Sequence, residues 1–173
     1  MTFDELAMPL LEALYNFACY LARDRSEADD LVQETYLKGL KGFSTFQPGT
    51  NFRAWMFRIL HNTFLTSKSG LAASRTVPLE DEEQGAAAVA VTRENPETLF
   101  LQNASDEMVR AAIADLPVIY REALLLCDVE EMSYQEIAET LAIPIGTVMS
   151  RISRARKAVR ERLQEKTLEA KHG

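Results

Sequence analysis

The chain has 173 residues, of which 47% are hydrophobic and 26% charged, and its formal net charge is −7. This composition is typical of a soluble globular protein with one ordinary domain or two small ones. The sequence has no apolar run of transmembrane length and no signal peptide, so we expect a cytoplasmic protein.

The negative charge is concentrated in the middle of the chain. Residues 1–70 carry seven Lys/Arg and eight Asp/Glu, residues 71–115 carry three and nine, and residues 116–173 carry nine and nine, giving −1, −6 and 0. Phosphate neutralisation supplies most non-specific affinity for DNA, so an acidic chain binds DNA weakly by itself. If this chain reads DNA, it either oligomerises or is brought there by a larger partner.

The cysteines predict neither a disulfide nor a zinc site. Cys19 and Cys127 lie far apart, without a CxxC pair or a Cys/His cluster. We expect two buried thiols, no metal site and no cofactor.

Apolar residues at helical spacing predict helices over residues 2–23 and 26–41. Thr2 and Glu5 form a possible capping box at the start of the first helix. On the second helix, polar residues gather opposite the apolar face. Such a face is ordinarily solvated, but a Leu among carboxylates also suits a partner site. The members of this face are Asp30, Gln33, Glu34, Leu37 and Lys41.

A turn at residues 46–50 (FQPGT) precedes a third predicted helix over residues 52–67. Asn51 is its candidate N-cap. Six of the fourteen aromatic residues lie between positions 43 and 64, and core packing accounts for most of them. Stacking on unpaired bases is the alternative. Arg58, His61 and Asn62 share the other face of this helix.

Residues 69–94 are rich in Ala, Ser, Gly and acidic side chains and lack aromatics, which predicts a flexible acidic linker. The linker would separate a domain at 1–68 from one at 95–173; covering a basic helix in the unbound protein is an alternative role. Helical spacing returns at residues 105–116 and 117–128. Without strand-like alternation or repeats, the predicted fold class is all-α, with two small helical domains.

Residues 133–163 predict a helix-turn-helix. Ser133 and Glu136 form a capping box for the first helix, and Pro144 suits the start of the second. The second helix has one apolar stripe, formed by Val148, Ile152, Ala155, Val159 and Leu163.

The other sides of this second helix are basic. Between Ile145 and Arg160 there are five cations and no anion. Thr147, Ser150, Arg151 and Arg154 fall off the stripe and are expected to face outward. Hydroxyls and arginines on the free face of a short helix suit the DNA major groove. A surface helix with solvated arginines is the alternative.

Two long motifs resemble the extracytoplasmic-function (ECF, group IV) RNA polymerase sigma factors. They are DDLVQETYLKGLKGFSTFQPGTNFRAWMFRILHN in the first half and LPVIYREALLLCDVEEMSYQEIAETLAIPIGTVMSRISRARKAV in the second. The resemblance covers nearly the whole chain. It implies a sigma-2 domain, a linker and a sigma-4 domain.

The resemblance also implies three sets of site residues. Core polymerase, through the clamp helices of its largest subunit, would bind the face of Asp30, Gln33, Glu34 and Leu37. The minus-ten element, with a flipped base and a melted strand, would contact Phe46, Gln47, Gly49, Thr50, Arg58, His61 and Asn62. The minus-thirty-five element would contact Thr147, Ser150, Arg151, Ser153, Arg154 and Arg156.

Members of this family are promoter-specificity subunits, usually restrained by an anti-sigma factor that is often membrane-bound. The resemblance therefore implies core polymerase, promoter DNA and an anti-sigma factor as partners in a stress or envelope response, with no catalytic residues and no small-molecule substrate. Several positions depart from the family pattern. Met149 replaces a frequent Lys or Arg, Ala142 and Glu131 replace frequent glycines, and Val118 and Ile119 stand where the family is usually charged. If the backbone φ is positive at Ala142 and Glu131, each of these two costs about 1 kcal/mol.

Three alternatives remain open from the residues alone. A helix-turn-helix regulator that works without polymerase would give a palindromic footprint as a dimer. A decoy that mimics a sigma factor would not need the basic helix. An enzyme built on Cys19, Cys127, His61 or the carboxylates would need a nucleophile–base pair, a phosphate loop or a metal motif, and none is visible.

Overall fold

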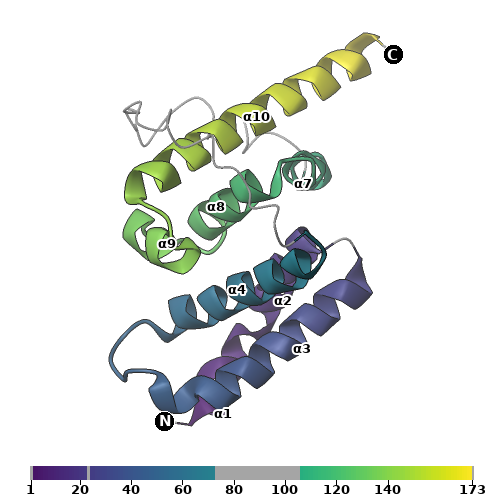
Figure 1. Ribbon diagram of the computed structural model, residues 1–173. Helices are drawn as coiled ribbons and strands as arrows, with labels where there is room; N and C mark the ends of the chain where they lie inside the picture. Colours follow the sequence, from purple (N-terminus) through teal and green to yellow (C-terminus); the bar gives the residue numbers. More distant parts are fainter. Residues whose placement is uncertain (1, 23, 73–105, 173) are drawn as a thin grey trace. The chain divides into compact units, whose positions relative to one another are not determined.

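The computed structural model describes residues 2–22, 24–72 and 106–172, and every regular element in this part of the chain is a helix (Figure 1). The all-α prediction is confirmed. Helices α1–α4 group with α9 in one compact unit, and α7, α8 and α10 form a second. The acidic linker predicted at 69–94 falls outside the described residues from position 73 onward, and the domain limits of 1–68 and 95–173 stay a prediction.

The first predicted helix is interrupted. Thr2 and Glu5 form the expected capping box at the start of α1 (Phe3–Ala7). A 3₁₀ turn, η1 (Met8–Leu10), follows, and α2 (Leu11–Leu21) completes the stretch. The prediction of one continuous helix was wrong because Pro9 has no N–H for the helical ladder.

Helix α3 (Arg25–Gly42) begins earlier than predicted. Asp24, rather than Ser26, is its N-cap, and Asp24 Oδ1 accepts a hydrogen bond of 2.8 Å from the Glu27 N–H. Midway along α3, a Cβ at Gly39 would lie 3.0 Å from Met56 Sδ and 3.1 Å from the Phe3 ring. The glycine therefore permits close packing of α3 against α1 and α4.

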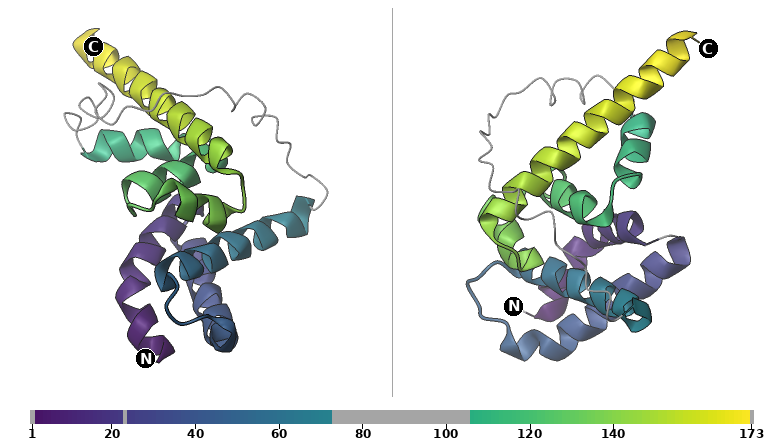
Figure 2. Two further views of the ribbon diagram at one scale, coloured as in Figure 1. Left: turned by 90° about the vertical axis from the view of Figure 1, so that its left-hand side faces the viewer. Right: turned by 45° about the horizontal axis from the view of Figure 1, so that its top comes forward.

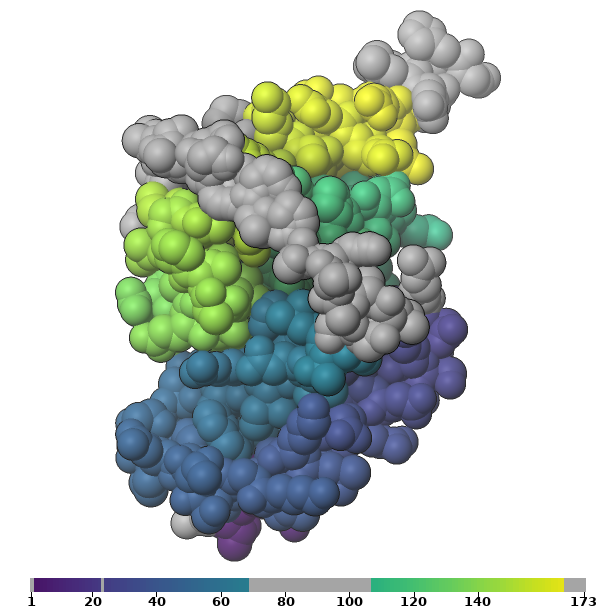
Figure 3. All heavy atoms as spheres, in the orientation of Figure 1, coloured from purple at the N-terminus to yellow at the C-terminus, as the bar shows by residue number. Residues whose placement is uncertain are grey.

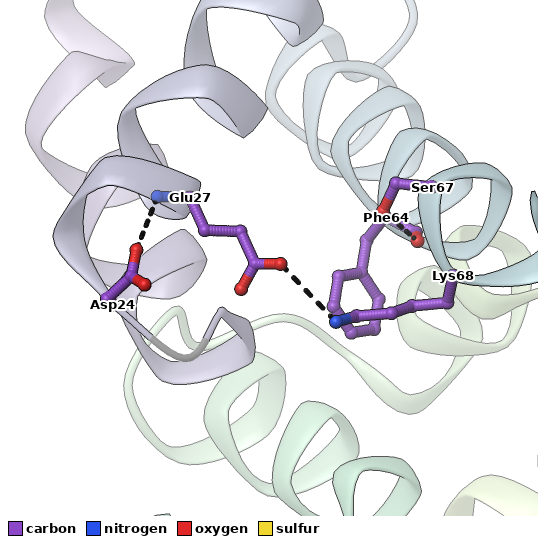
Figure 4. A network of polar contacts seen from close by, with 5 residues as sticks. All are labelled: Asp24, Glu27, Phe64, Ser67 and Lys68. Carbon is purple, nitrogen blue, oxygen red and sulfur yellow. Dashed lines mark hydrogen bonds and ion pairs between the residues drawn. The ribbon is translucent and has the colours of Figure 1, made fainter. Parts of the chain in front are cut away.

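Helix α4 (Phe52–Ala72) follows a 3₁₀ turn, η2 (Phe43–Thr45), and the predicted loop. Asn51 is the N-cap, as expected, because its Oδ1 accepts from the Ala54 N–H at 3.0 Å. The helix continues five residues beyond its predicted end at residue 67. Near that end, Lys68 Nζ lies 3.4 Å from Glu27 of α3 and 5.6 Å from the centroid of the Phe64 ring, which connects the two helices (Figure 4).

The second unit is built around α10 (Ile145–His172), the long helix that lies beside α8 (Val118–Asp128) in both orientations of Figure 2. Its predicted apolar stripe is confirmed, since every member is at most 1% exposed. Helix α7 (Asp106–Ala114) is capped by Arg121 of α8, whose Nη2 donates to Ala114 O at 3.1 Å and Leu116 O at 2.6 Å.

Helix α9 (Tyr134–Leu141) has the predicted capping box, because Ser133 Oγ accepts from the Glu136 N–H and Glu136 Oε1 accepts from the Ser133 N–H. The helix ends at Ala142, which has a φ of 59°, and Glu131 before the helix has a φ of 58°. Glu131 and Ala142, which replace frequent glycines of the family pattern, therefore both have a left-handed backbone conformation. No helix in the described part of the chain is long and apolar enough to span a membrane.

Candidate functional site

The predicted partner face on α3 is fully on the surface. Asp30, Gln33, Glu34 and Leu37 are all exposed, and Leu37 is 52% exposed. The opposite side of α3 is buried at Ala28, Leu31, Val32 and Thr35. Helix α3 and the turn after it form much of the visible surface of the first unit in Figure 3. The face thus combines carboxylates with an apolar side chain that no fold requirement explains.

A groove beside this face was not predicted. It has a volume of about 630 Å³, and Gln33 is shared between the groove and the predicted partner face. Met8 and Leu40, also on the surface of this unit, are each 56% exposed. The residue in the sequence that could have indicated this groove is Pro9. It interrupts the first predicted helix, and Met8 and Leu11 at this interruption are exposed. The lining residues are Met8, Pro9, Leu11, Glu12, Tyr15, Asp29, Val32 and Gln33.

The loop between α3 and α4 has an aromatic base and a polar tip. The Phe46 ring stacks on Phe43, with centroids 6.0 Å apart, and lies 5.2 Å from both Phe52 and Trp55. At the tip, Thr50 donates from its N–H and its hydroxyl to Gln47 O, at 3.2 and 2.6 Å.

The turn fits this path because Gly49 has a φ of +91°, where other residues are strained. Gln47, Gly49 and Thr50 are exposed, whereas Phe46 is half-buried. Phe46 is consequently a packing residue at least as much as a surface residue.

On α4, the three predicted DNA-contact residues do not share one exposed face. Arg58 and Asn62 are exposed, but His61 is only 7% exposed. The prediction of an outward imidazole was wrong because position 61 lies one turn after buried Phe57 and one residue after buried Leu60. His61 is part of the packed side of α4.

The first turns of α10 differ from the sequence prediction. Thr147 and Ser150 are 8% and 4% exposed, so the expectation that they face outward was wrong. Ser150 Oγ donates back to Thr147 O at 3.2 Å, which satisfies the hydroxyl inside the helix. Because Thr147, Val148 and Ser150 point to different sides of the helix and are all buried, this turn of α10 is packed on more than one side. Arg151, Ser153 and Arg154 are half-buried.

Arg156 is held by α8. Its Nη2 donates to Asp128 Oδ1 at 2.6 Å, and its Nε donates to Asp128 Oδ2 at 3.3 Å. The same Nη2 lies 3.7 Å from Cys127 Sγ. The Arg156 side chain is 19% exposed. Of the six residues predicted at the minus-thirty-five element, Arg156 is thus part of a two-point ion pair within the protein.

Two family models match the chain, one in each half. Residues 6–71 match the model described as Sigma-70 region 2, and residues 106–159 match Sigma-70, region 4. The chain is also 38% identical over 150 residues to the ECF RNA polymerase sigma factor EcfG of Rhodopseudomonas palustris, covering 87% of this chain and 77% of that protein. The chain belongs to the ECF sigma factors of the sigma-70 family.

Two further comparisons agree with the assignment. The ECF sigma factor SigE of Mycolicibacterium smegmatis is 34% identical over 97% of this chain, which spans 64% of the length of SigE. A solved structure of the sigma factor RpoE of Bartonella quintana, in complex with the anti-sigma factor NepR, matches with a TM-score of 0.71 and 29% identity. That match covers 94% of this chain and 96% of RpoE.

The cysteines of this sigma factor lie in different surroundings. Cys19 is exposed, which contradicts the expectation of two buried thiols, and Cys127 is partly buried. Burial, together with the neighbouring charge of Asp128, raises the pKa of Cys127 to about 11. The Cys127 thiol is therefore protonated at neutral pH and reacts poorly as a nucleophile.

Proposed function

We propose that this chain is a dissociable promoter-specificity subunit that binds RNA polymerase core and directs initiation at one class of promoters. The observation that supports this best is the outer face of α3. Asp30, Gln33, Glu34 and Leu37 are exposed together, while the other side of the helix supplies the core. A polar rim around an apolar side chain suits a protein partner, and we assign this face to the clamp helices of the polymerase.

We assign promoter reading to two other places. The polar tip of the 46–50 loop, with Arg58 and Asn62 on α4, would contact the melted minus-ten strand. Arg151, Ser153 and Arg154 on α10 would contact the minus-thirty-five element, where arginines suit phosphates and guanine edges. Core polymerase would supply most of the non-specific affinity that this acidic chain lacks, and the two weak readers on one scaffold would reinforce each other.

We further propose that an anti-sigma factor restrains the chain in the cytoplasm as part of a stress or envelope response. The support is the similarity to a sigma factor solved with NepR. On this proposal the chain has no catalytic site, and the polymerase performs all of the chemistry.

The test is transcription in vitro with purified core polymerase on a library of random promoters. We expect transcripts from templates that share an upstream and a downstream element, obtained only when this chain is added. Start sites that are the same with and without the chain would contradict the proposal. A palindromic footprint by the chain alone would favour a regulator that works without polymerase.

A further inference from the structure

One cation of the basic helix α10 is used inside the second unit. Arg156 makes two contacts with the Asp128 carboxylate, at 2.6 and 3.3 Å, using Nη2 and Nε of the guanidinium fork. The two residues are on α10 and α8, the helices that pack most extensively within this unit. Ala155 and Val159, beside Arg156 in sequence and one turn later, are at most 1% exposed. The pair therefore borders the packed seam between the helices.

A second ion pair of α10, between Arg162 and Asp115, differs in exposure. Arg162 Nη1 lies 3.3 Å from Asp115 Oδ2, and these side chains are 45% and 47% exposed. For Arg156 and Asp128 the values are 19% and 35%. Exposed single-contact pairs hold geometry weakly, whereas two-point guanidinium–carboxylate pairs fix both distance and orientation. Arg162 is thus a matched control on the same helix.

We propose that Asp128 is a positioning residue for promoter reading: it holds Arg156 and thereby fixes the rotation of α10 on α8, and Arg156 does not contact DNA. The inference rests on the proposed function, because it assumes that α10 reads the minus-thirty-five element. Arg154 lies two residues before Arg156, so a rotation of α10 about its axis would move its guanidinium relative to the bases. Removing either Asp128 or Arg156 should accordingly lower the preference for the specific promoter sequence without removing a contact to a DNA phosphate.

The test uses the full chain with core polymerase. The probes are a duplex of the promoter that the wild type transcribes best from a random library and a scrambled duplex of equal length. Affinity for both is measured from 50 to 300 mM salt for Arg156→Gln, Arg156→Lys, Asp128→Asn and the control Arg162→Gln. Arg156→Lys keeps the charge but loses the fork.

We expect all three changes at the pair to lower the ratio of specific to non-specific affinity by roughly two- to thirtyfold, without a change in salt slope. Arg162→Gln should leave the ratio unchanged. If instead Arg156→Gln lowers the salt slope by about 0.9 and Arg156→Lys restores it, Arg156 is a phosphate contact and the proposal is wrong. The proposal is also wrong if Asp128→Asn keeps the wild-type ratio of specific to non-specific affinity.

A second measurement separates this proposal from the proposed function. In a double-mutant cycle by urea unfolding, Asp128→Asn and Arg156→Gln should be less than additive, which shows the coupling without DNA. If the losses in the free energy of unfolding are additive, Asp128 does not hold Arg156 and the proposal is wrong, even if the chain reads promoters normally. If the two residues are coupled but the chain selects no promoter, the ion pair is still shown to connect α8 and α10. In that case the proposed role of both residues in promoter reading is wrong.

Discussion

Helices α3 and α10 both have one buried stripe, but their remaining faces are used differently. On α3 the residues off the stripe are on the surface, and the predicted set of Asp30, Gln33, Glu34 and Leu37 is exposed throughout. On α10, Thr147 and Ser150 are buried and Arg156 is paired with Asp128. The comparison teaches that a stripe pattern locates the core, whereas it does not show which off-stripe residues are available to a partner.

The first prediction concerns α3 and has the largest expected effect. Glu34→Lys should abolish transcription in vitro. It reverses a charge in the middle of the predicted partner face on α3, so that like charges of this chain and core polymerase would meet in a desolvated contact. The free energy of unfolding should hardly change, since Glu34 is exposed. Co-purification with core polymerase checks the result.

The control for this change is Glu107→Lys, the same charge reversal at an exposed position on α7. It should co-purify with core as the wild type does. Normal core binding by Glu34→Lys would remove α3 from the interface.

The second prediction concerns α10. Arg154→Ala should weaken use of the upstream element by 1–3 kcal/mol, or roughly 5- to 150-fold, because one guanidinium contact to DNA is lost. Core binding should be unchanged. Run-off transcription from promoters with and without an intact upstream element measures the effect, with Gln164→Ala, an exposed change later on α10, as the control. Equal loss of core binding would contradict separate roles for the two helices.

The third prediction concerns the end of α9, the first helix of the helix-turn-helix. Ala142→Gly should stabilise the protein by about 0.5–1 kcal/mol, because Ala142 has a φ of 59° and glycine removes the Cβ strain. The matched control Ala111→Gly, in an exposed helical position on α7, should destabilise by a similar amount. Urea unfolding gives both values, and a loss of stability in Ala142→Gly would show that the left-handed residue is not strained.

The smallest effect is expected at the end of α8. The native Cys127 thiol has a pKa of about 11, against an ordinary value of 9.0, so it keeps its proton where the unfolded thiol has lost it. Stability should therefore fall as pH rises from about 9 to about 11. In Cys127→Ala this decline should be shallower.

Alkylation distinguishes the two cysteines directly. At pH 8 the exposed Cys19 should react with iodoacetamide faster than Cys127, whose rate should still be rising near pH 11. Equal rates for the two thiols at pH 8 would contradict the burial of Cys127.

Local chemistry explains what the sequence could predict. The capping boxes at Thr2 and Ser133 and the stripe of α10 depend on near neighbours in the chain, and all were found from spacing. The break at Pro9 was missed although its cause is local. His61 and Arg156 could not be placed in this way, because their surroundings depend on how helices pack. For Arg156 the partner is 28 positions away in the chain.

The measurement that tests the central claim most directly is a titration of this chain onto purified core polymerase, with binding and transcription from the selected promoter followed in the same samples. We predict saturable binding, with promoter-specific transcripts that rise in proportion to occupancy and are absent without the chain. Transcription that does not depend on occupancy, or a chain that does not bind core at any concentration tested, would contradict it.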